Sequence, residues 1–243
     1  MIHWDEESIQ FMRDSAEHLR FADEQARHIL PYLPPDAEIC EGGCGLGYLS
    51  LALSPYAKHI TAVEKSSEAL MVLWQNLQRD EIPNITAVAA DIFTMQPKRR
   101  YDAMVFCRFG AVEEILRLAA EQCAGTVVVL TLANACHRFT LTEKTARRKE
   151  WFSREKLEEL KIPVQSEHFS VEMGQPLRSL ADAVRFFQIY DRSGETVTEK
   201  QVKDRLTADP KGVYPFFSPM TSEFRLLAFQ ADDVRQSMTG TAK

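Results

Sequence analysis

A run of glycines near the start of the chain, ICEGGCGLGY at residues 39–48, has the composition of a ligand-binding turn. Gly43, Gly45 and Gly47 follow a short apolar stretch, and Glu41 comes two residues before the first of them. Because glycine has no Cβ, the backbone can adopt positive φ and a ligand can touch the main chain. The helix expected after the turn directs free N–H groups at a bound anion. The turn alone therefore fits a pyrophosphate or a carboxylate equally well.

The spacing of the glycines and two further acids narrow the ligand class. A dinucleotide fingerprint has glycines at its first, third and sixth positions, whereas here they fall at the first, third and fifth. Glu64 ends the apolar run HITAV, and Asp91 ends the run VAA. The Glu64 carboxylate can accept hydrogen bonds from both ribose hydroxyls. NAD-dependent dehydrogenases place an acid at a similar position, so Glu64 supports nucleoside binding without separating the two classes. Three acids that close three successive strands favour a nucleoside ligand at the carboxyl edge of a sheet.

With Glu41 in front, the turn resembles motif I of the class I S-adenosylmethionine-dependent methyltransferases, and the resemblance covers about residues 35–135. It implies that Glu41 lies near the amino acid end of the cofactor and that Glu64 binds the ribose. It also implies that Asp91 accepts a hydrogen bond from the adenine amino group and that Ile92 lies beside the adenine ring. The cofactor-binding set that the resemblance implies is Glu41, Gly42, Gly43, Gly45, Gly47, Glu64, Lys65, Asp91, Ile92, Cys107 and Arg108.

The residues at the end of the fourth strand bear on the methyl acceptor. Relatives that methylate nucleic-acid or protein amide nitrogens often carry Asn/Asp-Pro-Pro-aromatic there, where this chain has Cys107-Arg108-Phe109-Gly110. This departure argues against a base or amide nitrogen as the methyl acceptor. The net charge of −6 argues against a protein that mainly binds nucleic-acid phosphates. We expect methyl transfer to a small molecule by in-line displacement. The alternatives are an RNA or protein methyltransferase that docks through the basic run at 144–149, a non-catalytic S-adenosylmethionine-binding module and, more distantly, an NAD dehydrogenase.

Composition points to a cytoplasmic protein with free thiols. The five cysteines are odd in number and include no Cys-x-x-Cys pair, so we expect neither a disulfide framework nor a metal site. The N-terminal residues lack the apolar core of a signal peptide. No stretch approaches the roughly 20 apolar residues that a membrane-spanning helix needs. We expect Cys40 and Cys44 to be packing residues and Cys107 to be pocket wall.

Apolar strands that alternate with helices predict a three-layer α/β/α sandwich with a seven-stranded, mostly parallel sheet of the Rossmann-like methyltransferase fold, whose seventh strand is antiparallel. The sequence predicts a single domain over 1–243. Its parts are an N-terminal helical segment (1–34), a core (35–173 and 223–231) and a helical cap insertion (174–222). The expected strands are 37–40, 59–63, 85–89, 101–107, 126–132, 164–173 and 223–230. The expected helices are 5–33, 48–53, 67–79, 113–122, much of 141–161, 179–190 and 198–206.

No catalytic residue is assigned, because no general base stands out. We expect His59 to be structural and His18 and His28 to lie on the surface. His3 with Trp4, and His137, are candidates to reach an acceptor site. The aromatic residues of the insertion are expected to form the core of the cap; they are Phe186, Phe187, Tyr190, Tyr214, Phe216 and Phe217.

Overall fold

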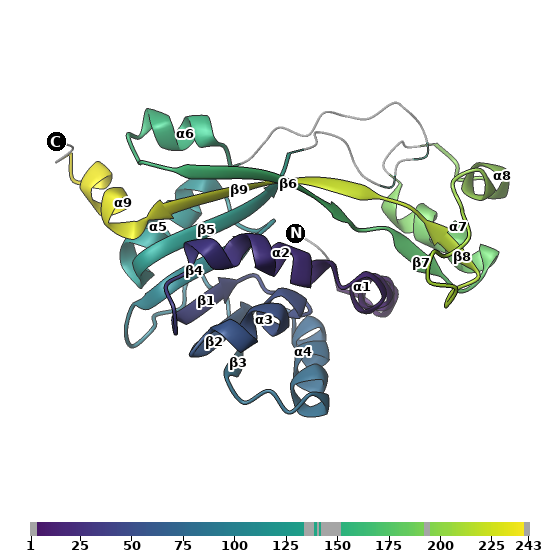
Figure 1. Ribbon diagram of the computed structural model, residues 1–243, viewed down its shortest axis with the longest axis horizontal. Helices are drawn as coiled ribbons and strands as arrows, with labels where there is room; N and C mark the ends of the chain where they lie inside the picture. Colours follow the sequence, from purple (N-terminus) through teal and green to yellow (C-terminus); the bar gives the residue numbers. More distant parts are fainter. Residues whose placement is uncertain (1–3, 134–138, 140, 142–151, 192–194, 241–243) are drawn as a thin grey trace.

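The computed structural model describes residues 4–133, 139, 141, 152–191 and 195–240. Its centre is a seven-stranded sheet in the order β3-β2-β1-β4-β5-β9-β6, in which β9 runs antiparallel to both of its neighbours and the pairs from β3 to β5 are parallel (Figure 1). This confirms the predicted fold class. The strands are β1 (Glu38–Gly42), β2 (His59–Glu64), β3 (Ile85–Ala89), β4 (Tyr101–Cys107), β5 (Cys123–Leu132), β6 (Gln165–Glu172) and β9 (Thr221–Gln230).

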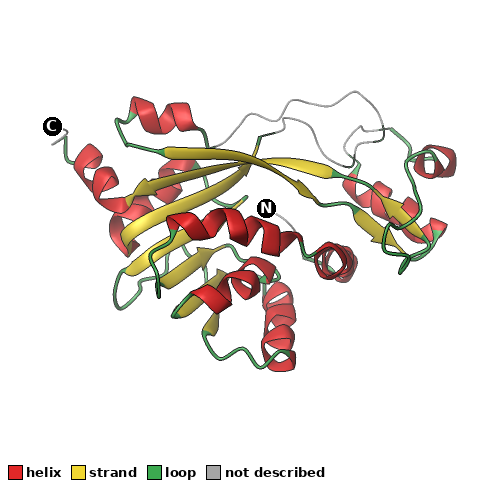
Figure 2. Ribbon diagram, viewed as in Figure 1, coloured by secondary structure: helices red, strands yellow, loops and turns green. Residues whose placement is uncertain are grey.

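Helices cover both faces of the sheet, as its continuous apolar strands require (Figure 2). On one face, α2, α3 and α4 pack on alternate residues such as Ile39, Ala103 and Val105. On the other face, α5, α6 and α9 pack on residues such as Met104 and Phe106. The helices are α2 (Phe21–Ile29), α3 (Tyr48–Leu53), α4 (Ser67–Arg79), α5 (Val112–Gln122), α6 (Arg154–Glu159) and α9 (Ala231–Met238), with short 3₁₀ turns at η1 (Leu30–Tyr32) and η2 (Ser54–Tyr56).

The N-terminal segment, expected as one helical stretch, is two helices. The first, α1 (Glu6–Leu19), begins with a capping box in which the Asp5 side chain accepts from the Ser8 amide and Ser8 accepts from the Asp5 amide. It ends at Arg20, whose left-handed backbone (φ 56°) turns the chain into α2. The helical spacing of apolar residues continues across Arg20 without glycine or proline, so the periodicity contained no sign of the break.

The insertion extends the edge of the sheet as an antiparallel arm. Glu172 of β6 pairs with Thr221 of β9, and the ladder resumes at Gln175 with Ser218. This second pair, β7 (Gln175–Leu177) with β8 (Phe216–Ser218), carries α7 (Leu180–Tyr190) and α8 (Glu199–Lys203), seen at the right of Figure 1. The two helices were expected, whereas β7 and β8 were not, because each strand has only three residues.

Helix α9 was not expected, and the expected helical stretch 141–161 is only partly within the described residues. Helix α9 follows β9 directly and buries Ala231 and Val234; no glycine, proline or side-chain cap marks its start. Within the expected helical stretch 141–161, α6 begins after the Ser153 cap, whose hydroxyl accepts from the Lys156 amide. His137 and the basic run at 144–149 lie outside the described residues.

Candidate functional site

A cavity of about 210 Å³ opens at the carboxyl ends of β1, β2 and β4. It brings together ten of the eleven residues expected from the sequence, and Gly42 is the exception. Gly42 lies inside β1, where an added Cβ would come within 2.6 Å of Phe106 and 2.8 Å of Ile92. The cavity wall contains Glu41, Gly43, Gly45, Gly47, Glu64, Lys65, Asp91, Ile92, Cys107 and Arg108. Their role in ligand binding stays a prediction.

The glycine turn has the backbone that its sequence demands. Gly43, Gly45 and Gly47 all have positive φ, at 69°, 55° and 79°, a region that L side chains rarely adopt. The amides of Gly43 and Cys44 donate to the Val63 carbonyl over 2.8 and 3.0 Å, which attaches the turn to β2. Gly47 is the N-cap of α3. The first amides of α3 therefore start beside the cavity, at a helix end that favours negative charge.

Glu64 stabilises the turn from the end of β2. Its Oε2 accepts from the Gly45 amide at 3.1 Å, and its Oε1 accepts from the amides of Lys65 and Ser66 at 2.9 and 3.0 Å. A carboxylate has about four acceptor positions. Three are used by the chain itself, so two ligand hydroxyls can both be accepted only if one of these amide bonds opens.

Glu41 is an acid inside the fold rather than at its surface. It is 2% exposed, and Ser50 of α3 donates its hydroxyl to Glu41 Oε2. Burial raises the pKa of Glu41 to about 7; hydrogen bonds from Ser50 lower it in part, and the charge of Glu64 raises it further. Near neutral pH both the protonated and the ionised carboxyl are therefore populated, so the charge of a ligand can change the protonation state of Glu41.

The far wall of the cavity is aromatic. Asp91 accepts from the Phe93 amide at 3.0 Å, and the Phe93 ring stacks on Phe109 with centroids 5.5 Å apart and planes 7° apart. The Phe109 ring lies against Gly43, in the space that a Cβ would fill. Ile92, at 2% exposure, belongs to the buried cluster against which Phe93 and Phe109 pack. Phe93 and Phe109 line the cavity although no motif singled them out.

The N-terminal segment also lines the cavity, through Trp4 ahead of α1, Met12 of α1, and Phe21, Ala22 and Gln25 of α2. A Cβ on Gly45 would come within 3.0 Å of the Trp4 ring. Trp4 was a candidate for this position with His3, which lies outside the described residues. The other four were missed, because apolar residues in an amphipathic helix look the same whether they cover a core or a cavity.

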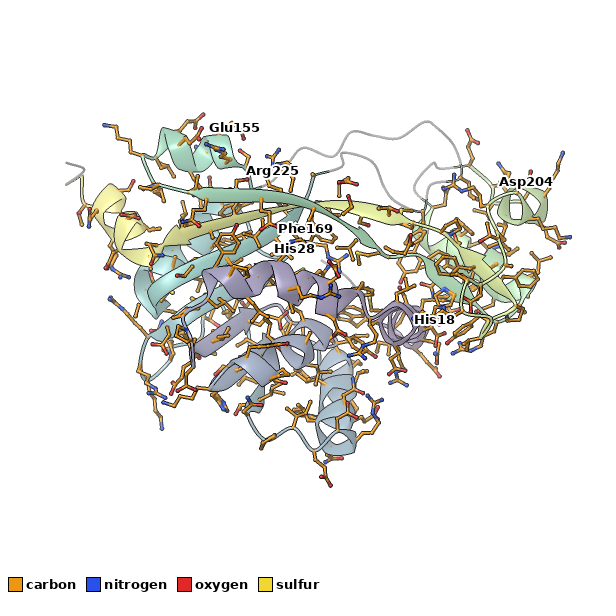
Figure 3. All side chains as sticks on the ribbon, in the orientation of Figure 1. His18, His28, Glu155, Phe169, Asp204 and Arg225 are labelled. Carbon is orange, nitrogen blue, oxygen red and sulfur yellow. The ribbon has the colours of Figure 1, made fainter. Side chains whose placement is uncertain are left out.

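Two histidines expected on the surface are in fact held in tertiary contacts (Figure 3). His18 is 8% exposed, and its Nε2 lies 2.8 Å from Oδ1 of Asp209. His28 stacks on Phe169 with centroids 3.8 Å apart, and its Nδ1 lies 2.6 Å from Glu167 Oε1. The expectation was wrong for His18, because a helix face that looks polar can be covered by a polar partner distant in sequence, whereas the His28 side chain is 25% exposed.

The other expectations for reactive side chains agree with the structure. His59 pairs with Thr86 at 3.0 Å on the neighbouring strand, which is a structural role. Cys40 and Cys44 are buried, and burial raises the pKa of both thiols. Cys107 lines the cavity.

The aromatic residues of the insertion form a core together with α1. Phe186 and Phe187 are at most 1% exposed, and Phe186 meets the Phe11 ring edge-on at a centroid distance of 5.1 Å. Phe217 is 4% exposed. Their burial agrees with the expectation. Throughout the described part of the chain, each helix is too short or too polar to cross a membrane.

One comparison with known families matches the region of the glycine turn. Residues 39–128 match the family model described as a methyltransferase domain. A search of curated proteins finds no match. The matched segment contains the glycine turn, Glu64, Asp91 and the end of β4.

Solved structures share the fold at low sequence identity. The YcgJ protein from Bacillus subtilis is 13% identical with a TM-score of 0.52, over 86% of this chain and 97% of its own. A putative methyltransferase from Bacillus halodurans is 11% identical with a TM-score of 0.52, over 86% and 98%. Coclaurine N-methyltransferase, bound to N-methylheliamine and SAH, is 15% identical with a TM-score of 0.50, over 88% and 71%. Identities this low show the fold alone.

Proposed function

We propose that this chain, whose residues 39–128 match the model of a methyltransferase domain, is an S-adenosylmethionine-dependent methyltransferase and that its methyl acceptor is a small molecule. The observation that carries this proposal is that α1 and α2 add the apolar residues Met12, Phe21 and Ala22 to the cavity wall. A cavity wall that combines the strand ends with apolar residues of two helices suits a compact acceptor better than a polymer. The net charge of −6 also disfavours a nucleic-acid backbone.

The residues at the cavity fit S-adenosylmethionine. Side chains are absent at Gly43, Gly45 and Gly47, which leaves main chain at the cavity wall. A Cβ at Gly43 or Gly45 would meet Phe109 or Trp4, two other residues of that wall. We propose that Glu64 accepts hydrogen bonds from the ribose hydroxyls and that Asp91 accepts a hydrogen bond from the adenine amino group. Ile92 would flank the adenine ring. Glu41 then lies on the side of the amino acid group, where an ammonium would favour its ionised form.

The cofactor, when bound, supplies a methyl group on a sulfonium, which is already a strong methyl donor. The chain's own residues therefore have to orient the acceptor and exclude water. We propose that the Phe93–Phe109 stack and the apolar residues of α1 and α2 do both, because they supply much of the apolar wall of the cavity. None of the histidines that the structure describes lines the cavity, so the proposal assigns no histidine base.

We propose that residues 174–222 act as a cap on the acceptor side. The arm contacts α1 through Ser15, whose hydroxyl donates to the Gly174 carbonyl at 2.8 Å, and through the His18–Asp209 pair. Because α1 and α2 both line the cavity, the arm can influence acceptor access through them.

The cofactor assignment is tested by calorimetric titration of S-adenosylhomocysteine into the wild type, Asp91→Asn and Glu64→Gln. Each substitution keeps the shape and removes a charged acceptor, so we expect affinity to fall about 10- to 100-fold. Asp80→Asn is the matched control, because Asp80 pairs with Arg79 outside the cavity. Affinities equal to wild type in both site variants would contradict the assignment.

The acceptor class is tested by turnover to S-adenosylhomocysteine with a panel of small amines, phenols, thiols and carboxylates, alongside total RNA and a protein extract. Turnover with a small molecule supports the proposal. Turnover with RNA or protein alone contradicts it, and salt-dependent RNA binding would then identify the docking mode. Cofactor binding without turnover on any of these acceptors would favour a non-catalytic module.

A further inference from the structure

A serine of α3 lies behind the cavity wall, in contact with the buried acid of β1. Ser50 is 0% exposed and is not among the residues that line the cavity. Its hydroxyl donates to Oε2 of Glu41, which is 2% exposed and does line the cavity. Ser50 is therefore placed to affect a bound ligand through Glu41 rather than by touching it.

The positions beside Glu41 in the sheet are apolar. Its register partners are Ala62 of β2 and Val105 of β4, both 0% exposed. A carboxylate in such surroundings loses hydration, and hydrogen bonds to its charged form replace part of that loss. Burial raises the pKa of Glu41 to about 7, although hydrogen bonds from the hydroxyl and the amide of Ser50 lower it. Ser50 thus favours the ionised form of Glu41.

Packing alone does not explain a serine at this position. Ser50 lies between Leu49 and Leu53, which are buried in the hydrophobic core under α3. A buried hydroxyl costs free energy unless it is hydrogen-bonded, and alanine has the higher helix propensity. The bond to Glu41 accounts for the hydroxyl.

We propose that Ser50 is a positioning residue, which holds the Glu41 carboxylate ionised at the cavity wall so that a cationic group of a ligand binds there. This rests on the proposed function, in which the cationic group is the ammonium of the cofactor. Protonation of Glu41 removes the charged partner of that ammonium, and binding weakens. Ser50 then sets, from outside the cavity, the pH range in which the cavity binds a cation.

Other titratable groups lie near Glu41 or share its cavity wall. Glu64, at the end of β2, repels the Glu41 carboxylate and raises its pKa further. Burial raises the pKa of the Cys40 and Cys44 thiols, so both are neutral near pH 7. Among the described residues, the other titratable side chains of the wall are Tyr48, Lys65, Asp91, Cys107 and Arg108. A Glu41→Gln variant contains all of these groups and separates their titration from that of Glu41.

The test measures calorimetric affinity for S-adenosylhomocysteine in wild type and Ser50→Ala at pH 6, pH 7 and pH 8.5. Loss of a hydrogen bond to a charged group should raise the midpoint of the pH profile by about one unit. We expect Ser50→Ala to bind about 5-fold more weakly at pH 7 and within about 2-fold of wild type at pH 8.5. Weakening by one constant factor, or no weakening at any pH, would overturn the proposal.

A ligand without the ammonium separates charge from shape. 5′-Methylthioadenosine keeps the nucleoside and the thioether but has no amino acid group. Its affinity at pH 7 should not fall by more than about 2-fold in Ser50→Ala, which would also show that the variant cavity is folded. Equal weakening of both ligands would overturn the proposal.

The double variant Ser50→Ala/Glu41→Gln tests whether Ser50 acts through Glu41. With glutamine at this position no carboxylate remains to be held. Ser50→Ala should therefore change S-adenosylhomocysteine affinity by less than about 2-fold in the Glu41→Gln background. A further loss as large as in the wild-type background would show an independent effect of Ser50 and would overturn the proposal.

Two control variants identify the role of the hydroxyl. Ser54 is 6% exposed, its hydroxyl donates to the Leu51 carbonyl at 2.8 Å, and it does not line the cavity. Ser54→Ala should keep the wild-type pH midpoint, and so should Ser50→Thr, which retains a hydroxyl. A midpoint shifted as in Ser50→Ala, in either control, would overturn the role of the Ser50 hydroxyl.

Failure of the proposed function gives a different result. A wild type that binds neither S-adenosylhomocysteine nor 5′-methylthioadenosine would contradict the cofactor assignment. A wild type that binds both, with the same pH profile as Ser50→Ala, would overturn the role of Ser50 alone.

Discussion

At the scale of single residues, the buried acid Glu41 connects the glycine turn to the protein interior. It projects from β1 toward Ser50 of α3, and its burial raises its pKa to about 7. The folded protein therefore binds the carboxyl proton more tightly than the unfolded chain, in which the pKa is near 4.5. Stability from this group is present at low pH and is lost as pH rises through about 7.

Substitution of this acid should remove one pH dependence of stability. Between pH 5 and pH 8 the wild type should lose about 3 kcal/mol relative to Glu41→Gln, because the glutamine cannot ionise. Urea unfolding of the ligand-free proteins at both pH values measures the difference. Parallel pH profiles for the two proteins would show that Glu41 ionises as easily in the folded as in the unfolded state.

At the scale of elements, the glycine turn is tied into the packing of α4. Gly47 has φ 79°, and a Cβ there would come within 2.5 Å of Leu73, a buried residue of α4. The turn thus depends on glycine twice, for its backbone angle and for the space that Leu73 occupies. Gly212, in the arm, has φ 67° and nothing within 4 Å of an added Cβ.

Alanine substitutions at Gly47 and Gly212 separate the cost of backbone strain from the cost of overlap with Leu73. We expect Gly212→Ala to lower the free energy of unfolding by about 1 kcal/mol, from backbone strain alone. Gly47→Ala should lower it by about 3 kcal/mol, because overlap with Leu73 adds to the strain. Urea unfolding measures both values. Equal losses in the two variants would mean that Leu73 moves aside without cost.

At the scale of the whole molecule, α1 links the arm to the cavity. It contacts the arm through Asp14 with Arg178 at 2.6 Å, and through His18 with Asp209 at 2.8 Å. Asp209 is held by several donors. Burial tends to raise its pKa, but hydrogen bonds from the amides of Tyr214, Lys211 and Val213 and from His18 outweigh burial and lower the pKa to about 2. Charged Asp209 thus contributes to this contact at all but strongly acidic pH.

Ligand binding should therefore slow amide hydrogen exchange in elements beyond the glycine turn. We expect S-adenosylhomocysteine to slow amide hydrogen exchange in α1 and α2, which line the cavity, and in β7 and β8, which the contacts of α1 join to them. Helix α9 packs on the opposite face and should not change. Slowing that is confined to the residues around Gly45, Glu64 and Asp91 would show that the arm is independent of the cavity.

Particular elements show what the sequence could predict. Helices α3 and α4 and strands β3 and β4 have the expected bounds, because caps, proline and turn residues limit them locally. The break at Arg20, the short strands of the arm and α9 were missed, since their ends depend on tertiary contacts. The same reason explains His18, whose partner Asp209 is 191 residues away.

The sequence by itself determined that Glu41, the glycines, Glu64 and Asp91 would meet, because the carboxyl ends of neighbouring parallel strands lie at one edge of a sheet. Only the tertiary structure decided what covers that edge. Helices α1 and α2 bring Met12, Phe21 and Gln25 to the cavity, and the turn after β4 brings Arg108. Packing between elements distant in the chain sets these positions, and local patterns of apolar and polar residues do not encode them.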